Sequence, residues 1–221
     1  AQVTAKDVIL AIIARIGTSG PSKEDRYPYN TGPFETAIDD NGILWVNNVY
    51  QRTVARVDTE SDTLLGITNL YGGDVTQAAM WGMAVDHRGH VWLSPTWDGP
   101  PPYDIVELSP QGAILSRTPS RTNGGGTAIT EDQDGNIWIT GPVIHPSGQY
   151  SEFLYPKLLS KFDPITKTWP CEVTGIDAIA VSQGSDGRIY AVNSGGGIYK
   201  IDRRTCALLN KTESIGSSFM T

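Results

Sequence analysis

The stretch Asp132-Gln133-Asp134-Gly135-Asn136-Ile137-Trp138 decides the fold, because variants of it recur along the chain. The phrase reads D-D-N-G-I-L-W at 39–45 and D-H-R-G-H-V-W at 86–92, and a weaker copy, G-S-D-G-R-I-Y, occupies 184–190. Its glycines are 47, 46 and 52 residues apart, at Gly42, Gly89, Gly135 and Gly187. Such a period, with a tight turn before an apolar and aromatic strand, is typical of a β-propeller. The sequence therefore predicts an all-β fold of repeated blades.

Each repeat predicts four strands, which make one propeller blade. A short strand leads into the phrase, the aromatic strand follows, and a third strand ends in an acidic or Ser-Pro turn before a fourth. The predicted blades span about 33–71, 77–120, 125–175 and 177–216. Residues 217–221 are left over as the first strand of a fifth. We expect a four-bladed ring, an incomplete propeller, or one completed by association, because open sheet edges and apolar faces favour association.

The residues of the phrase are expected to form scaffold. Asp at its start can accept hydrogen bonds from nearby backbone N–H groups, and Gly tolerates the positive φ of such hairpins. The aromatic residue that ends each copy is predicted to fill the space between neighbouring blades. These residues are Trp45, Trp92, Trp138 and Tyr190.

The N-terminal stretch departs from the repeat. Thr4 and Asp7 resemble a capping box, Val8–Ile16 is almost entirely apolar, and Gly17 supplies a stop, so a helix is predicted at about 5–16. Being apolar on all sides, it should pack against another element. The resulting organisation is an N-terminal helix (1–17), a linker (18–32) and a propeller (33–221).

Residues 3–18, Val-Thr-Ala-Lys-Asp-Val-Ile-Leu-Ala-Ile-Ile-Ala-Arg-Ile-Gly-Thr, also resemble a segment of the large subunit of isopropylmalate dehydratase. None of that family's cluster-binding cysteines follows, so no iron–sulfur site is inferred. A borrowed segment and a chance similarity both stay open.

Composition limits the partners. Lys+Arg number 17 against 24 Asp+Glu, a net charge of −7, which argues against a nucleic-acid or anionic-membrane partner. The two cysteines, Cys171 and Cys206, either bridge adjacent blades or remain buried thiols. With the glycosylation-type triplet Asn210-Lys211-Thr212, they favour a periplasmic or extracellular location.

Several phrases resemble the streptogramin B lyase (virginiamycin B lyase) group and the propellers of two-component sensors. They are Gly32-Pro33-Phe34, Ala55-Arg56-Val57-Asp58, Gly135–Thr140 and Tyr199-Lys200-Ile201-Asp202. For the lyases, this resemblance implies a catalytic histidine on an inner strand and acidic residues that hold Mg²⁺. The histidines here, His87, His90 and His145, fall in turns and loops instead, which favours a binding protein over an enzyme.

A second resemblance, to gluconolactonase and regucalcin-like propellers, implies a divalent metal on the propeller axis. The candidate ligands are Glu35, Asn48, Asp177 and Asn193, which would hold Mg²⁺ or Ca²⁺ through oxygen atoms. The alternative is that the carboxylates lie in water and the asparagines serve turns.

Two insertions, Ser94–Asp104 and Gly141–Pro156, lengthen the second-to-third strand connections of blades two and three. Long loops with aromatic residues often bind ligands, although they can instead cover a blade edge. The candidate ligand-binding residues are Trp97, Asp98, Tyr103, Tyr150 and Phe153.

The sequence thus predicts a non-catalytic propeller that binds a protein, glycan or small ligand through these loops, with no cofactor. The first alternative is a metal-dependent lyase or lactonase acting at the central channel. The second is a structural module that self-associates through the N-terminal helix or an open blade edge.

Overall fold

The computed structural model describes residues 35–49, 51–74, 76–95, 103–121, 128–142, 157–176, 178–193 and 197–212. In these ranges the chain forms four antiparallel sheets of four strands each, and every sheet is a simple meander in chain order. The strands of the first two sheets are β1 (Glu35–Ile38), β2 (Ile43–Asn48), β3 (Thr53–Asp58), β4 (Thr63–Asn69), β5 (Met80–Val85), β6 (Val91–Pro95), β7 (Asp104–Leu108) and β8 (Ile114–Pro119). Those of the last two are β9 (Ile129–Glu131), β10 (Ile137–Pro142), β11 (Lys157–Asp163), β12 (Thr168–Thr174), β13 (Ala180–Gln183), β14 (Ile189–Val192), β15 (Ile198–Ile201) and β16 (Leu208–Lys211).

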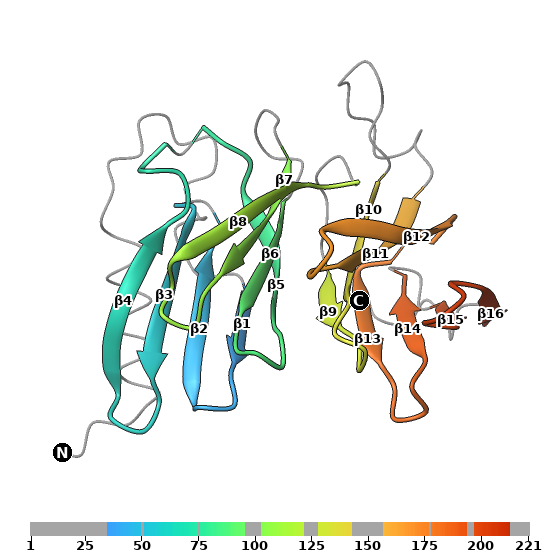
Figure 1. Ribbon diagram of the computed structural model, residues 1–221, viewed down its shortest axis with the longest axis horizontal. Helices are drawn as coiled ribbons and strands as arrows, with labels where there is room; N and C mark the ends of the chain where they lie inside the picture. Colours follow the sequence, from blue (N-terminus) through green and yellow to red (C-terminus); the bar gives the residue numbers. More distant parts are fainter. Residues whose placement is uncertain are drawn as a thin grey trace, which may run out of the picture.

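The sheets follow one another through their first strands. β1 contacts β5, β5 contacts β9, and β9 contacts β13, so these four strands form the inner row (Figure 1). Among the described residues, the first and fourth sheets make no comparable contact. The all-β fold of four four-stranded blades is confirmed, and the described blades form an arc.

The predicted N-terminal helix (1–17), the linker (18–32) and the leftover strand (217–221) lie outside the described residues. The described part contains strands and turns without a helix, so no helix there could cross a membrane.

The repeated phrase forms the hairpin between the first and second strands of each blade. The glycine has a φ of 75° at Gly42 and 82° at Gly135, values that a residue with a Cβ rarely adopts. The turn chemistry predicted from the sequence is confirmed. A second set of turns, between the third and fourth strands, is closed by Asp58, Ser109, Asp163 and Asp202, which accept backbone N–H groups.

The tryptophans of the phrase are fully buried between blades, as predicted. Trp45 of the first sheet packs with Met80 and Met83 of the second. Trp92 lies edge-on to Phe162 of the third sheet, with ring centroids 5.6 Å apart, and Trp138 joins the core of the fourth. Tyr190, on the last described sheet, is only half-buried. Most of the core therefore lies at the seams between consecutive blades, and one further cluster, formed by Leu44, Val46, Ala55 and Val57, belongs to the first sheet alone.

The two cysteines form a disulfide. It joins Cys171 on β12 to Cys206, which precedes β16, and so it links the outer strands of the third and fourth sheets. Of the two alternatives left by the sequence, the bridge between adjacent blades is confirmed, and it is compatible with an oxidising compartment.

Candidate functional site

The two ends of the blades differ in construction. We call the end that carries the first-to-second strand turns (39–42, 86–90, 132–136 and 184–188) the hairpin end; Figure 1 shows all four turns on its lower side. The opposite end, where the second strand connects to the third, is called the loop end.

At the hairpin end, one carboxylate holds each of the first three turns. Asp132 accepts the backbone N–H groups of Asp134 and Asn136, and its second oxygen accepts Nε1 of Trp138 at 2.8 Å. Asp39 and Asp86 make the same bond to Trp45 and Trp92, at 3.2 and 2.9 Å. Burial opposes ionisation of Asp86, but the bonds from Trp92, Arg88 and His90 outweigh it and keep its pKa below the usual value. The first acid of the phrase is therefore structural.

In the fourth copy of the phrase, a carboxylate at a different position bonds the aromatic residue. Gly184 stands where the other copies have Asp, and Asp186, two positions later, accepts the hydroxyl of Tyr190 at 2.9 Å. Lys200 donates to the same carboxylate, which lowers the Asp186 pKa. The weaker sequence copy is thus also a weaker, more exposed version of the same turn.

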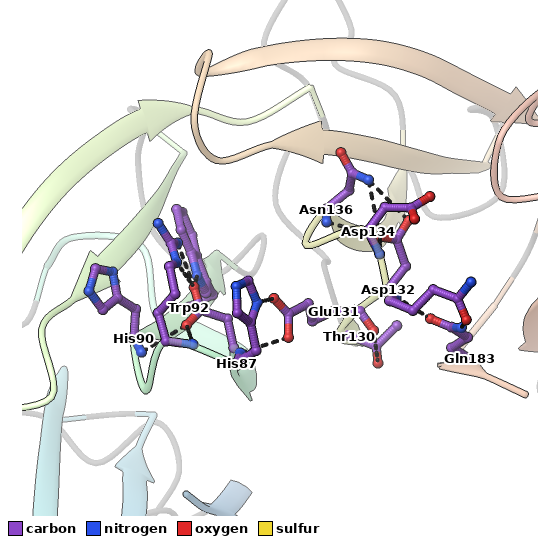
Figure 2. A network of polar contacts seen from close by, with 12 residues as sticks. His87, His90, Trp92, Thr130, Glu131, Asp132, Asp134, Asn136 and Gln183 are labelled. Carbon is purple, nitrogen blue, oxygen red and sulfur yellow. Dashed lines mark hydrogen bonds and ion pairs between the residues drawn. The ribbon is translucent and has the colours of Figure 1, made fainter. Parts of the chain in front are cut away.

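Polar side chains join neighbouring turns at the hairpin end (Figure 2). His87 of the second sheet donates its backbone N–H to Oε2 of Glu131 in the third, and its Nδ1 lies 2.5 Å from Oε1. Gln133 and Gln183 repeat the arrangement between the third and fourth sheets, at 2.5 and 2.9 Å. Between the first and second sheets, which form the first seam, the residues equivalent to these two pairs are Asp40 and Val85. These contacts fix the register between blades.

Glu107 is the most heavily bonded acid of the described residues outside the turns. It is 5 % exposed and accepts bonds from Lys167 at 2.7 Å, Ser116 at 2.6 Å and His90 at 2.9 Å. Burial opposes its ionisation, but these three bonds outweigh burial and lower its pKa. Because these bonds occupy its lone pairs, Glu107 has a structural role at the seam between the second and third sheets.

At the loop end, Glu35 is a half-buried acid that lacks such support. Burial raises its pKa to about 7, against one bond from the Met83 backbone N–H that lowers it. Glu35 pairs across the strands with the fully buried Asn47, whose Nδ2 donates to the Met80 carbonyl at 2.7 Å. Oε2 of Glu35 and Oδ1 of Asn47 are buried without a hydrogen-bond partner among the described residues. A proton or a cation between two such acceptors would satisfy both of them.

The predicted metal ligands are placed as follows. Glu35 begins β1, and Asn48 ends β2 with its oxygen accepting the backbone N–H of Gln51 at 3.2 Å. Asn193 follows β14 and accepts the Gly197 N–H at 2.6 Å, while Asp177 lies outside the described residues. Figure 1 places β1 and β14 apart, with β9 between them. The described residues contain no group of three or more His, Cys, Asp or Glu suited to a metal, and the predicted set stays a prediction.

Of the predicted ligand-binding residues, only Tyr103 lies in the described part. It is half-buried just before β7, burial raises its pKa, and its carbonyl accepts the Ser120 N–H at 2.8 Å. Trp97, Asp98, Tyr150 and Phe153 lie outside that part. Tyr103 thus marks the base of the blade-two loop.

Comparison with solved structures supports the propeller fold. The chain resembles Kuenenia stuttgartiensis hydrazine synthase, with a TM-score of 0.66, 12 % identity, and coverage of 87 % of this chain and 52 % of that one. It resembles the Pan2 WD40 domain of Neurospora crassa with a TM-score of 0.63, 12 % identity, and coverage of 86 % and 52 %. The chain therefore spans about half the length of these two chains. A streptogramin B lyase structure matches with a TM-score of 0.49, 16 % identity, and coverage of 84 % and 70 %.

No family model and no curated protein matches the chain. The resemblance of residues 3–18 to isopropylmalate dehydratase consequently has no support from these comparisons.

Sequence reasoning missed the contacts that cross the seams. Aligning the repeats would have shown one signal, because the residue that pairs with each blade aromatic is Arg56, Glu107, Lys161 or Lys200. Glu107 is the one acidic residue in this set, which indicates that the seam between the second and third sheets has different side-chain contacts from the others.

Proposed function

We propose that this protein is a non-catalytic β-propeller module that binds a protein, glycan or small ligand at the loop end of blades two and three. One observation carries the proposal. Among the connections between second and third strands, the two longest, from Pro95 to Asp104 and from Pro142 to Lys157, leave adjacent sheets at the same end. The hairpin end instead has short turns whose carboxylates are used in structural bonds.

Chemistry in these connections supports recognition. Their sequences combine Trp, Tyr and Phe with proline, and aromatic side chains supply large contact areas at low entropic cost. Tyr103 is anchored at the base of one connection by its backbone bond to Ser120. The net charge of −7 favours neutral or cationic ligands over anionic ones. The disulfide supports placing the protein in the periplasm or outside the cell.

A glycan array and a peptide array, each screened with the full chain, test this function. For any captured probe, Trp97→Ala and Tyr103→Ala should weaken binding at least tenfold in calorimetry. Tyr190→Ala, at the hairpin end of the fourth sheet, is the matched aromatic control and should leave the affinity unchanged. Equal affinity for all three variants would refute the loop-end site.

The metal-dependent lyase or lactonase remains a second candidate, and Glu35 is the observation that favours it. A half-buried carboxyl with a pKa near 7, beside a second buried acceptor, is the kind of perturbed group that gathers at reactive sites. Calorimetric titration with Mg²⁺ and Ca²⁺ tests it. Binding that Glu35→Ala and Asn193→Ala both abolish would support this candidate, and absence of heat would reject it.

A further inference from the structure

The first sheet has an apolar face that turns away from the second sheet. Trp45 and Val54 point toward the second sheet, so their strand neighbours point the other way, because side chains alternate along a strand. This outer face has two cross-strand pairs at its centre, Leu44 with Val57 and Val46 with Ala55, and Ile38 and Ile67 on the edge strands.

The centre of the outer face is buried, although no other described sheet lies over it. Leu44, Val46, Ala55 and Val57 form a cluster of their own and are 7 %, 2 %, 1 % and 2 % exposed. On the rim of the same face, Ile38 is 64 % and Ile67 is 51 % exposed. An uncovered sheet face keeps its central side chains accessible, so burial confined to the centre indicates a narrow covering element.

The fourth sheet, at the opposite end of the arc, does not need a covering element over its outer face. The face of the fourth sheet that points away from the third carries Ser182, Lys200 and Asn210 around Tyr190, with the apolar pair Val192 and Ile198 beside them. These polar side chains can face water, as the terminal unit of a repeat protein must. The two ends are therefore unequal, because the outer face of the first sheet has four apolar side chains at its centre, whereas Lys200 lies at the centre of the corresponding face of the fourth.

We propose that Val8–Ile16 lies across the outer face and caps the propeller at the first sheet. This segment is the most apolar stretch outside the described ranges, and it belongs to the N-terminal stretch that leads into β1. The other long stretches, 96–102, 143–156 and 213–221, are joined to the second, third and fourth sheets.

The dimensions agree with this occupant. A helix over 5–16 would be about 18 Å long, and four strands spaced about 4.8 Å apart span about 14 Å between the outermost two. Residues 17–34 can extend to about 60 Å, which leaves the segment free to reach the face. Arg15 is the one charged residue within Val8–Ile16, and it can lie on the side of the segment that faces water. The cap occupies the place that the preceding sheet takes at the other blades and keeps a second copy from docking there.

Cysteine cross-linking in the full chain tests the cap. Ile38→Cys, on the rim of the face, is combined with single cysteines introduced in turn at each position from Val8 to Ile16. Ile179→Cys, a 53 % exposed isoleucine next to β13, replaces Ile38→Cys in the matched control. After oxidation, peptide mapping should show a cross-link within one chain for at least one position, at tenfold or more the control yield. Cross-links only between chains would assign the face to a second copy, and none above the control would overturn the proposal.

A second measurement needs no cross-link. Ile13→Asp should release the outer face and raise the fluorescence of an apolar dye several-fold, whereas Ile165→Asp, at a 74 % exposed position, should leave it unchanged. Equal fluorescence of the two variants would also overturn the cap.

Discussion

Nζ of Lys167, in the third sheet, lies 2.7 Å from Oε2 of Glu107 in the second and 4.9 Å from the centre of the Trp92 ring. At the first seam, Arg56 lies over Trp45 and donates to the Pro110 carbonyl at 3.0 Å. At the third seam, Lys161 lies over Trp138 and donates to the Arg203 carbonyl at 2.9 Å. Every seam therefore has a cation over its tryptophan, but at the second seam the cation comes from the following blade.

Lys167→Met should weaken the second seam. It removes one of the three donors that keep buried Glu107 ionised, and we expect a loss of about 1–2 kcal/mol in the free energy of unfolding at pH 7, measured in urea. Because the Glu107 pKa is lowered in the folded state, this contribution exists above the unfolded pKa and disappears as the pH falls through the folded one. The difference from wild type should therefore shrink in acid.

Arg188→Met is the matched control for Lys167→Met. Arg188 pairs with Asp186 at 3.1 Å, but both side chains are substantially exposed, so the pair should add little. A loss as large as that of Lys167→Met would show that the second seam has no special dependence on its cation.

Asp132→Asn tests the carboxylate that closes the hairpin turn. The substitution keeps the volume but replaces one acceptor oxygen with an amide that faces Trp138 Nε1 or the turn N–H groups. We expect a loss of about 2 kcal/mol in the free energy of unfolding. Asp186→Asn, in the exposed fourth turn, should cost much less. Similar losses in both turns would contradict a buried Asp–Trp bond as the stabilising contact.

The fold could be predicted because its determinants are local. The hairpin phrase places Asp, Gly and Trp within seven residues, and that spacing alone specifies the turn and the residue that fills the seam. Side-chain contacts between blades could not be predicted in the same way. His87 meets Glu131 across 44 residues, and the pairing depends on how one sheet is shifted against the next, which no single repeat encodes.

The candidate site could be predicted from the sequence only in part, because it too depends on contacts between blades. The sequence singled out Glu35 as a residue facing the channel, but its burial beside Asn47 and the Met83 N–H depends on the first seam. The sequence also left the cysteine pairing open, since only the packing of β12 against the fourth sheet brings Cys171 to Cys206.

Replacing both cysteines, in Cys171→Ser/Cys206→Ser, should destabilise the fourth blade. Closing a loop across a separation of 35 residues is worth about 3–4 kcal/mol in the chain-entropy model. Hydrogen exchange should speed up first in β15 and β16, which pack at the end of the arc. The wild-type protein should show the same faster exchange in these strands when a reductant breaks the disulfide. Unchanged exchange in these strands would show that packing alone holds the blade.

Glu35→Gln should stabilise the protein at neutral and alkaline pH. Burial raises the folded-state pKa to about 7, so folding takes up a proton between the ordinary value of 4.5 and 7, and wild-type stability should fall as the pH rises through this window. The amide has no charge to desolvate, so the variant should gain roughly 1–2 kcal/mol at pH 8, after allowance for partial solvent screening, and almost nothing at pH 4. Glu107→Gln is the control of opposite sign, because its lowered pKa makes the carboxylate stabilising above its window. Urea denaturation from pH 4 to 8 measures both, and a Glu35→Gln profile parallel to wild type would mean that Glu35 is ionised and solvated in the folded protein.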